Sequence, residues 1–161
     1  MQIILNAFRL KPLDAVLPAA QRAGVGILAR VPLASGLLSG KYDERTEFAA
    51  SDHRSYNRHG EAFDQGETFS GVDYAEGVRA AQEFSRLVAE RGPDGATPAQ
   101  AAIAWVLQLP GVTSVIPGAR NVRQAESNAA AGRLPRLPTA FDQGVHALYD
   151  EHFRAAIHDR W

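Results

Sequence analysis

The chain of 161 residues contains no cysteine. This absence excludes disulfide bonds, thiol nucleophiles and metal sites built from cysteine. The sequence also lacks an excess of charge of either sign, because 17 lysines and arginines face 18 aspartates and glutamates, for a net charge of −1. We therefore expect no nucleic-acid partner, since proteins that bind nucleic acids usually carry a basic excess.

Long hydrophobic runs are missing as well. No apolar stretch approaches the length of a membrane span, so we expect no membrane partner. The first residues, MQIILNAFRL, have neither a basic leader nor a small-residue cleavage site, unlike a signal peptide. With 45% hydrophobic and 22% charged residues, the composition is that of a globular protein. We expect a cytoplasmic protein with one domain over residues 1–161.

Two common phosphate-binding motifs are absent. No G-x-G-x-x-G occurs, and the sequence GLLSGKY is no G-x-x-x-x-G-K-[ST] loop, because Tyr42 stands where serine or threonine is required. Metal-binding histidine pairs are absent too, since no two histidines have the helical spacing of three or four that a metal favours. We expect no metal and solvated histidines at positions 53, 59, 146, 152 and 158.

Three apolar runs predict strands at residues 2–8, 25–31 and 112–116. Continuous apolar strands that alternate with helices are typical of a parallel α/β sheet with both faces covered. Helical periodicity and capping residues predict the helices in between. They cover about 11–24, with Pro18 at a kink or near the start, then 73–92, 97–109 and 121–131, and a last helix begins at Thr139.

Residues 43–72 show no sustained periodicity. A loop of this length inside a compact domain is usually functional or disordered. Its stretch DHRSYNRH can be an active-site segment, with Tyr56 as an acid and Arg54 or Arg58 as an anion clamp, or a polar lid, and we favour the lid. The aromatic side chains of the segment argue against plain disorder: Phe48, Tyr56, Phe63 and Phe69.

The stretch VIPGARNVRQAESN suits an anion. It follows a predicted strand, and Gly118 lets a ligand approach the backbone. The helix that begins near Asn121 directs its N-terminus there, and Arg120 adds a bidentate phosphate donor. Gln124 and Asn128 share one helix face and suit an adenine or a ribose. From spacing alone, an ordinary turn with an exposed arginine is the more frequent outcome.

The stretch PLASGLLSGK also follows a strand. Ser35, Gly36 and nearby backbone amides suit a pyrophosphate, with Lys41 as a counter-charge. The alternative is a flexible surface loop, and the residues alone favour neither.

Taken together, these segments resemble the aldo-keto reductase superfamily. GVGILARVPLASGLLSGKY is similar to its seventh strand and the following loop. TPAQAAIAWVLQLPGVTSVIPGARNVRQAESN is similar to its seventh helix, eighth strand and cofactor-phosphate helix. The resemblance implies an α/β fold, a partial (β/α)8 TIM-type barrel. It would be the C-terminal half, from about strand six, with about three parallel strands, extra helices and a long loop.

The resemblance also implies a site for NADP(H). Gln2 would bind the nicotinamide amide, and Arg30 falls where many members stack an aromatic ring on the nicotinamide, which a guanidinium plane can also do. Arg120 favours NADP(H), because a 2′-phosphate needs a cation. The pyrophosphate loop would be Pro32, Leu33, Ser35, Gly36 and Lys41, and the adenosine 2′-phosphate and adenine site would be Gly118, Arg120, Gln124 and Asn128.

No catalytic residue is assigned, because the family's Asp, Tyr, Lys and His lie on the first half of the barrel. The resemblance implies the cofactor-holding half of an NADPH-dependent reductase that acts on small-molecule carbonyls. The alternatives are a non-catalytic NADP-binding or interaction module, or an inactive truncation product. An incomplete barrel exposes a sheet edge, so we expect self-association or pairing with the N-terminal half.

Overall fold

A computed structural model gives the structure of residues 1–160, so Trp161, the last residue of the expected domain, lies outside the described part. Three parallel strands form one sheet in the order β1 (Gln2–Ile4), β2 (Ile27–Arg30) and β3 (Val112–Ile116). The register pairs Ile3 with Ala29 and Ala29 with Val115. This confirms the prediction of an α/β fold with three parallel strands.

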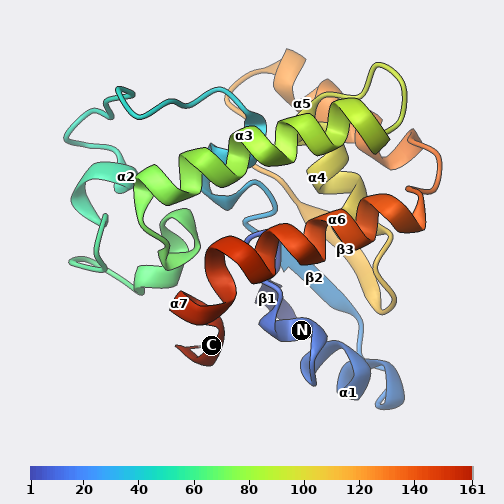
Figure 1. Cartoon of the computed structure of the whole chain (residues 1–161). Coiled ribbons are helices and arrows are strands. Elements are labelled where there is room, and N and C mark those ends of the chain that lie inside the picture. Colours follow the sequence, from blue (N-terminus) through green and yellow to red (C-terminus); the bar gives the residue numbers. More distant parts are fainter. Residues whose placement is uncertain (161) are drawn as a thin grey trace.

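Helices pack on one side of this sheet, and α3 and α6 lie side by side in front of it (Figure 1). None of the helices in residues 1–160 is long and apolar enough to cross a membrane. The bounds are α1 Val16–Arg22, α2 His53–Tyr56, α3 Tyr74–Arg91, α4 Pro98–Leu107, α5 Val122–Ala130, α6 Thr139–Tyr149 and α7 Ala155–Ile157, with a π-helical turn at Asp150–Arg154 between the last two.

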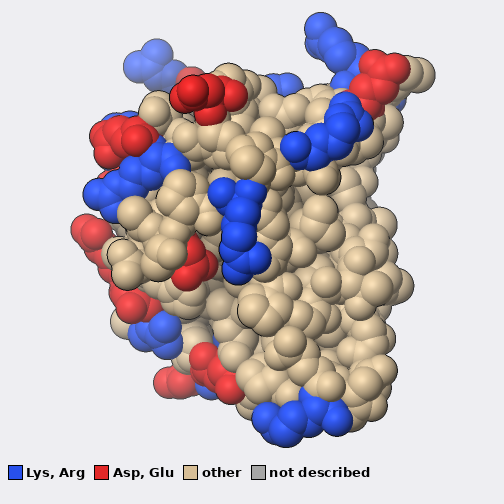
Figure 2. Space-filling model, turned by 90° about the vertical axis from the view of Figure 1, so that its right-hand side faces the viewer, with Lys and Arg blue, Asp and Glu red and all other residues tan. Residues whose placement is uncertain are grey.

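The two faces of the sheet differ in burial. Ile27 and Ala29 are fully buried beneath the helices, whereas Leu28 is 40% and Ile116 47% exposed on the other face. Figure 2 shows a broad area without charged side chains over the middle of the right-hand part of the view. The expectation that both faces are covered is therefore wrong, because successive side chains of β2 point to opposite faces and only one of these faces is buried.

The first strand is shorter than predicted. It ends at Ile4, and the chain then turns at Asn6, whose side-chain Oδ1 accepts a hydrogen bond from the Phe8 backbone N–H at 2.9 Å. The side-chain amide of Asn6 also donates to the Val31 carbonyl oxygen at 2.9 Å. The residues that follow are buried, so their apolar character indicates burial in the core and not strand structure.

Local capping signals give most of the helix ends correctly. Thr97 and Gln100 form the predicted capping box at the start of α4, and the Asp73 side chain accepts a hydrogen bond from the Glu76 N–H at the start of α3. Pro18 lies in the first turn of α1. Gly24, at φ +67°, follows the end of that helix in the left-handed conformation that glycine favours.

Residues 43–72 form an ordered wall, in which the regular structure is limited to the short helix α2 and the 3-10 turns Gln65–Glu67 and Phe69–Gly71. Phe48 and Phe69 lie 5.8 Å apart between ring centres, and the Arg58 guanidinium sits 4.9 Å over the Phe69 ring. The buried Asn57 side chain donates to Thr68 Oγ1 at 3.1 Å and accepts from backbone N–H groups of the same segment. The argument against plain disorder is confirmed, because aromatic packing replaces backbone ladders here.

Candidate functional site

A cleft of about 1110 Å³ opens at the carboxyl ends of β2 and β3. Its walls come from the loop after β2, side chains of the 43–72 segment, the first turn of α4 and the loop between β3 and α5. In parallel sheets, ligands commonly bind at the carboxyl ends of the strands, because neighbouring loops converge there. The cleft is therefore the candidate functional site.

Ten of the eleven residues expected to hold a cofactor line this cleft. The fold thus brings together two stretches that lie about 80 positions apart in the sequence. Gln2 lies outside the lining, exposed on β1 beside its register partner Leu28. The lining set is Arg30, Pro32, Leu33, Ser35, Gly36, Lys41, Gly118, Arg120, Gln124 and Asn128.

On the β3 side, amide side chains hold the loop before α5. Asn121 caps the helix by accepting a hydrogen bond from the Gln124 N–H at 2.9 Å. The Gln124 side-chain oxygen accepts from the Arg120 N–H at 2.8 Å, and Asn128 donates to the Gly118 carbonyl oxygen at 3.0 Å. These bonds fix the loop, and both Gln124 and Asn128 line the cleft.

Two cations of the cleft are free for an anion. Lys41 and Arg120 are exposed, and neither side chain has an acidic group within ion-pair distance in residues 1–160. Gly118 adds open space, because a Cβ at this position would meet no atom within 4 Å. The N-terminus of α5 opens beside Arg120, and its backbone N–H groups favour negative charge.

The loop after β2 is held in an unusual backbone conformation. Val31, Ala34 and Ser35 all have positive φ, at 56°, 48° and 56°. Ser35 Oγ donates to the Glu67 carbonyl oxygen at 3.1 Å and accepts from the Phe69 N–H at 3.0 Å. The hydroxyl thus fastens this loop to the 43–72 wall, and such strain persists only where surrounding contacts impose it.

Arg30 makes an ion pair that the sequence did not reveal. Both terminal nitrogens of its guanidinium donate to the two carboxylate oxygens of Glu67. The hydrogen bond from Arg30 holds the pKa of the Glu67 carboxyl below its usual range, and the same bond raises the pKa of Arg30. Both groups therefore stay charged around neutral pH, and the Arg30 charge is neutralised within the chain.

Arg54 is the most buried charge of the cleft wall, with 7% of the residue exposed. Its Nε donates to Asp52 Oδ1 at 2.8 Å, another nitrogen reaches Asp52 Oδ2, and a third bonds to the Tyr42 hydroxyl. These bonds from Arg54 hold the pKa of Asp52 well below its usual range. With its donors engaged, Arg54 serves the wall and not an anion clamp.

The remaining residues of DHRSYNRH do not assemble the active-site alternative. His53 lines the cleft, but Tyr56 is 47% exposed outside the lining, and Arg58 stacks on the rings of Phe69 and Tyr74. No acid and anion clamp therefore meet at the cleft in this segment.

Sequence reasoning missed several lining residues. Glu67 and Phe63 lie in the aperiodic segment, where no local pattern marks a role, while Thr97, Pro98 and Ala99 gave only a helix-start signal. The capping box of α4 was visible, but its position beside the cleft depends on tertiary packing.

The prediction that all histidines are solvated is wrong for two of them. His158 is 8% exposed, and its ring lies 3.0 Å from the Tyr149 hydroxyl and 2.9 Å from an Asp14 carboxylate oxygen. The side chain of His152 is also 8% exposed, and it packs between two glutamates of α3. The acidic partners lie 144 positions from His158 and 76 and 69 positions from His152, so periodicity gave no sign of this burial.

Comparison with known proteins places the chain. The model described as "Aldo/keto reductase family" matches residues 1–149. L-glyceraldehyde 3-phosphate reductase of Escherichia coli O157:H7 is 33% identical over 117 residues, which are 72% of this chain and 31% of that protein. An aldo-keto reductase of Strobilurus tenacellus is 28% identical over 76% of this chain and 33% of that protein. The chain spans about a third of the length of these curated relatives.

Solved structures give the same answer. A glycerol dehydrogenase from Gluconobacter oxydans matches with a TM-score of 0.74 at 25% identity, covering 94% of this chain and 42% of that chain. An aldo-keto reductase from Bacillus halodurans, in its holo form, shares the fold with a TM-score of 0.63 at 19% identity, covering 91% of this chain and 41% of that chain. The parallel sheet with its packed helices places the fold in the α/β class. With the match over residues 1–149, the chain belongs to the aldo/keto reductase family.

Proposed function

We propose that this chain forms the cofactor-holding half of an NADPH-dependent reductase that converts carbonyls to alcohols. In this proposal the three strands are the C-terminal part of a (β/α)8 barrel. The observation that carries it is the cleft, which gathers ten of the eleven residues expected at the cofactor and leaves two cations free.

The residues present fit a dinucleotide. A cleft of about 1110 Å³ is large for a single small metabolite, and Lys41 and Arg120 supply positive charge for phosphates. Gly118 leaves room against the backbone, and the α5 N-terminus supplies N–H donors. The cleft therefore offers what a phosphate-bearing cofactor requires.

Each residue has a separate role in the proposal. Arg120 binds the 2′-phosphate, and Lys41 with the Ser35–Gly36 backbone binds the pyrophosphate. Gln124 and Asn128 hold the Arg120 loop and offer their free atoms to the adenosine. The cofactor supplies the hydride that reduces the carbonyl. We assign no group of residues 1–160 to proton transfer, so the catalytic residues belong to another part of the barrel.

The open sheet face supports pairing with that part, or self-association. Leu28 and Ile116 are exposed there on neighbouring strands, and exposed large apolar side chains that share one face often mark a contact surface. We propose the N-terminal half of the barrel as partner and a second copy as the substitute when it is absent. Sedimentation of the chain with and without Leu28→Ser tests self-association. The cytoplasmic location and the single domain stay predictions.

Calorimetric titration of the chain with NADPH and NADH tests the cofactor assignment. We expect tighter binding of NADPH, because NADH lacks the 2′-phosphate that Arg120 reads. Arg120→Ala removes a charge-assisted bond and should lower the NADPH affinity about tenfold or more, while the NADH affinity changes little.

Arg123→Ala is the matched control, since Arg123 lies in the first turn of α5, close to Arg120 in the sequence but outside the cleft lining. Equal binding of both nucleotides by the unaltered chain would contradict the role of Arg120. Absence of binding by either nucleotide would favour the alternatives of an interaction module or an inactive product.

A further inference from the structure

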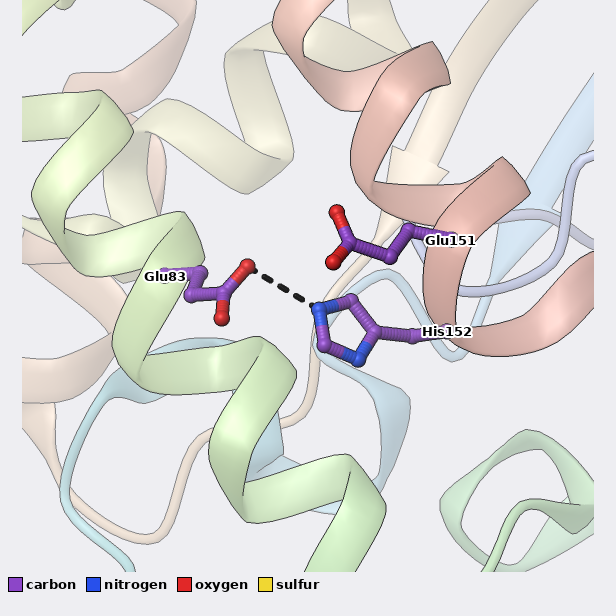
Figure 3. A group of neighbouring side chains, drawn as sticks. All are labelled: Glu83, Glu151 and His152. Carbon is purple, nitrogen blue, oxygen red and sulfur yellow. Dashed lines mark hydrogen bonds and ion pairs between the residues drawn. The ribbon is translucent and has the colours of Figure 1, made fainter.

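A second cluster of ionisable side chains joins α3 to the turn after α6. Glu83 projects from α3, and Glu151 and His152 project from the π-helical turn Asp150–Arg154 (Figure 3). None of the three lines the cleft. The cluster thus lies apart from the proposed cofactor site, and an inference about it is independent of the proposed function.

His152 has carboxylates at both ring nitrogens. Its Nδ1 contacts Glu76, and its Nε2 lies 2.9 Å from Glu83 Oε2, while the side chain is 8% exposed. A neutral imidazole carries one N–H, so it can donate to only one of two carboxylates. The other contact then needs additional positive charge, either a second proton on the ring or a cation between the nitrogen and the carboxylate.

Glu151 adds a third donor at the same place. One ligand atom each from Glu83, Glu151 and His152 lies within 4.8 Å of the other two. The carboxylates of Glu83 and Glu151 both face the imidazole ring (Figure 3). The ligands of a tetrahedral zinc ion lie about 3.4 Å apart, which follows from bond lengths of about 2.1 Å. Binding of one ion therefore requires side-chain rotations that widen the 2.9 Å separation of His152 Nε2 and Glu83 Oε2 and bring the Glu151 carboxylate closer.

We propose that Glu83, Glu151 and Nε2 of His152 bind a divalent transition-metal ion of the zinc type. One imidazole and two carboxylates suit zinc, whereas magnesium and calcium prefer oxygen ligands alone. Glu76 completes the site from behind, because it accepts the Nδ1 proton and so directs the Nε2 lone pair toward the ion. The ion would fasten the C-terminal helical segment to α3.

Neighbouring cations do not block the site. Arg79 pairs with Glu76, on the side away from Nε2, and Arg86 approaches Glu83 at 3.6 Å. The Arg86 side chain is 64% exposed and can turn to solvent when an ion binds. The expectation of no metal came from the spacing between histidines. That test does not detect this set, which contains one histidine and joins positions 83, 151 and 152.

Zinc titration of the metal-free chain at pH 7.5, with a chelating indicator as competitor, tests the proposal. We expect one zinc ion per chain and no comparable binding of magnesium. The decisive variant is Glu151→Gln, because Glu151 is exposed and has no hydrogen bond or ion pair among residues 1–160. It should lower the zinc affinity at least about tenfold and leave the stability of the zinc-free chain unchanged.

Glu90→Gln, also exposed on α3, is the matched control and should bind zinc as the unaltered chain does. Glu76→Gln should weaken zinc binding about tenfold through the lost support of Nδ1. Absence of stoichiometric zinc binding, or binding that Glu151→Gln leaves intact, would overturn the proposal. The cluster would then be a protonated histidine held between Glu76 and Glu83.

Discussion

On one side of the cleft, arginines are bound to carboxylates of their own chain, and on the other side an arginine stands alone. Arg30 pairs with Glu67 and Arg54 with Asp52 on the 43–72 wall. Arg120, in the loop before α5, has no acidic partner in the described chain. The difference separates two uses of one residue type, because a neutralised guanidinium holds structure whereas a free one can bind an anion.

Burial follows the same division. Phe69 and Arg54 of the wall are almost fully buried, but no residue of α5 is, and Val122 is 72% exposed. Substitutions on the wall should therefore change the free energy of unfolding, and substitutions on the α5 side should change ligand affinity.

The largest effect is expected for Phe69→Ala. Phe69 is fully buried against Phe48 and Tyr74, so its truncation should lower the free energy of unfolding by about 3–5 kcal/mol. Urea denaturation followed by circular dichroism measures this loss. Val122→Ala, on the other side of the cleft, should change the same quantity by less than about 0.5 kcal/mol. Similar losses for the two variants would remove the distinction between the sides.

Asp52→Asn is expected to cost about 2 kcal/mol near neutral pH, because it leaves the buried Arg54 without its carboxylate. Since the bond from Arg54 lowers the folded-state pKa of Asp52, its contribution is complete above the unfolded pKa of about 3.9 and is lost as the pH falls below it. The nearby His53, 3.4 Å away, adds attraction when protonated.

Denaturation of both proteins between pH 7 and pH 3 checks this sign. The stability difference should shrink as the pH falls below about 4. The exposed Asp159 supplies a control, since Asp159→Asn should leave the pH dependence as it is. A gap between the proteins that widens toward acid would show that Asp52 acts in some other way.

The sequence predicts structure that neighbouring residues determine, and it does not predict contacts between residues far apart in the chain. The strand at 112–116 and the Thr97 capping box follow from neighbouring residues, and both are confirmed. The Arg30–Glu67 pair joins positions 37 apart, and the His152–Glu76 contact joins positions 76 apart. No periodicity relates such positions, so only the folded chain reveals them.

The candidate site shows the same limit. Family resemblance marked the residues at the ends of two strands, and the fold brings ten of them to one cleft. It did not mark Glu67, which changes the meaning of Arg30 from a free cation to a neutralised one. The chemical state of a predicted residue thus depends on a partner that its motif does not contain.

Glu67→Gln should release Arg30 from its ion pair and so make it a free cation, as Arg120 is on the other side of the cleft. The pair is partly exposed, at 33% for Arg30 and 25% for Glu67, so the loss of stability should be about 1 kcal/mol. Release of Arg30 adds a free cation, and we expect NADPH to bind about twofold to threefold more tightly at low salt. Glu47→Gln, exposed in the same segment, is the control. Weaker binding by Glu67→Gln would mean that the pair shapes the cleft for its ligand.

The smallest effect on stability is expected for Arg120→Ala. Its side chain has no partner within residues 1–160, so the free energy of unfolding should change by less than about 0.5 kcal/mol. Arg54→Ala is the opposite case, because the same replacement on the wall removes hydrogen bonds to Asp52 and Tyr42 from a buried position. Measured side by side, the first variant should keep its unfolding midpoint and lose NADPH affinity, whereas the second should lose stability. If the unfolding midpoint of Arg120→Ala also falls, Arg120 stabilises its loop and is not free to bind a phosphate.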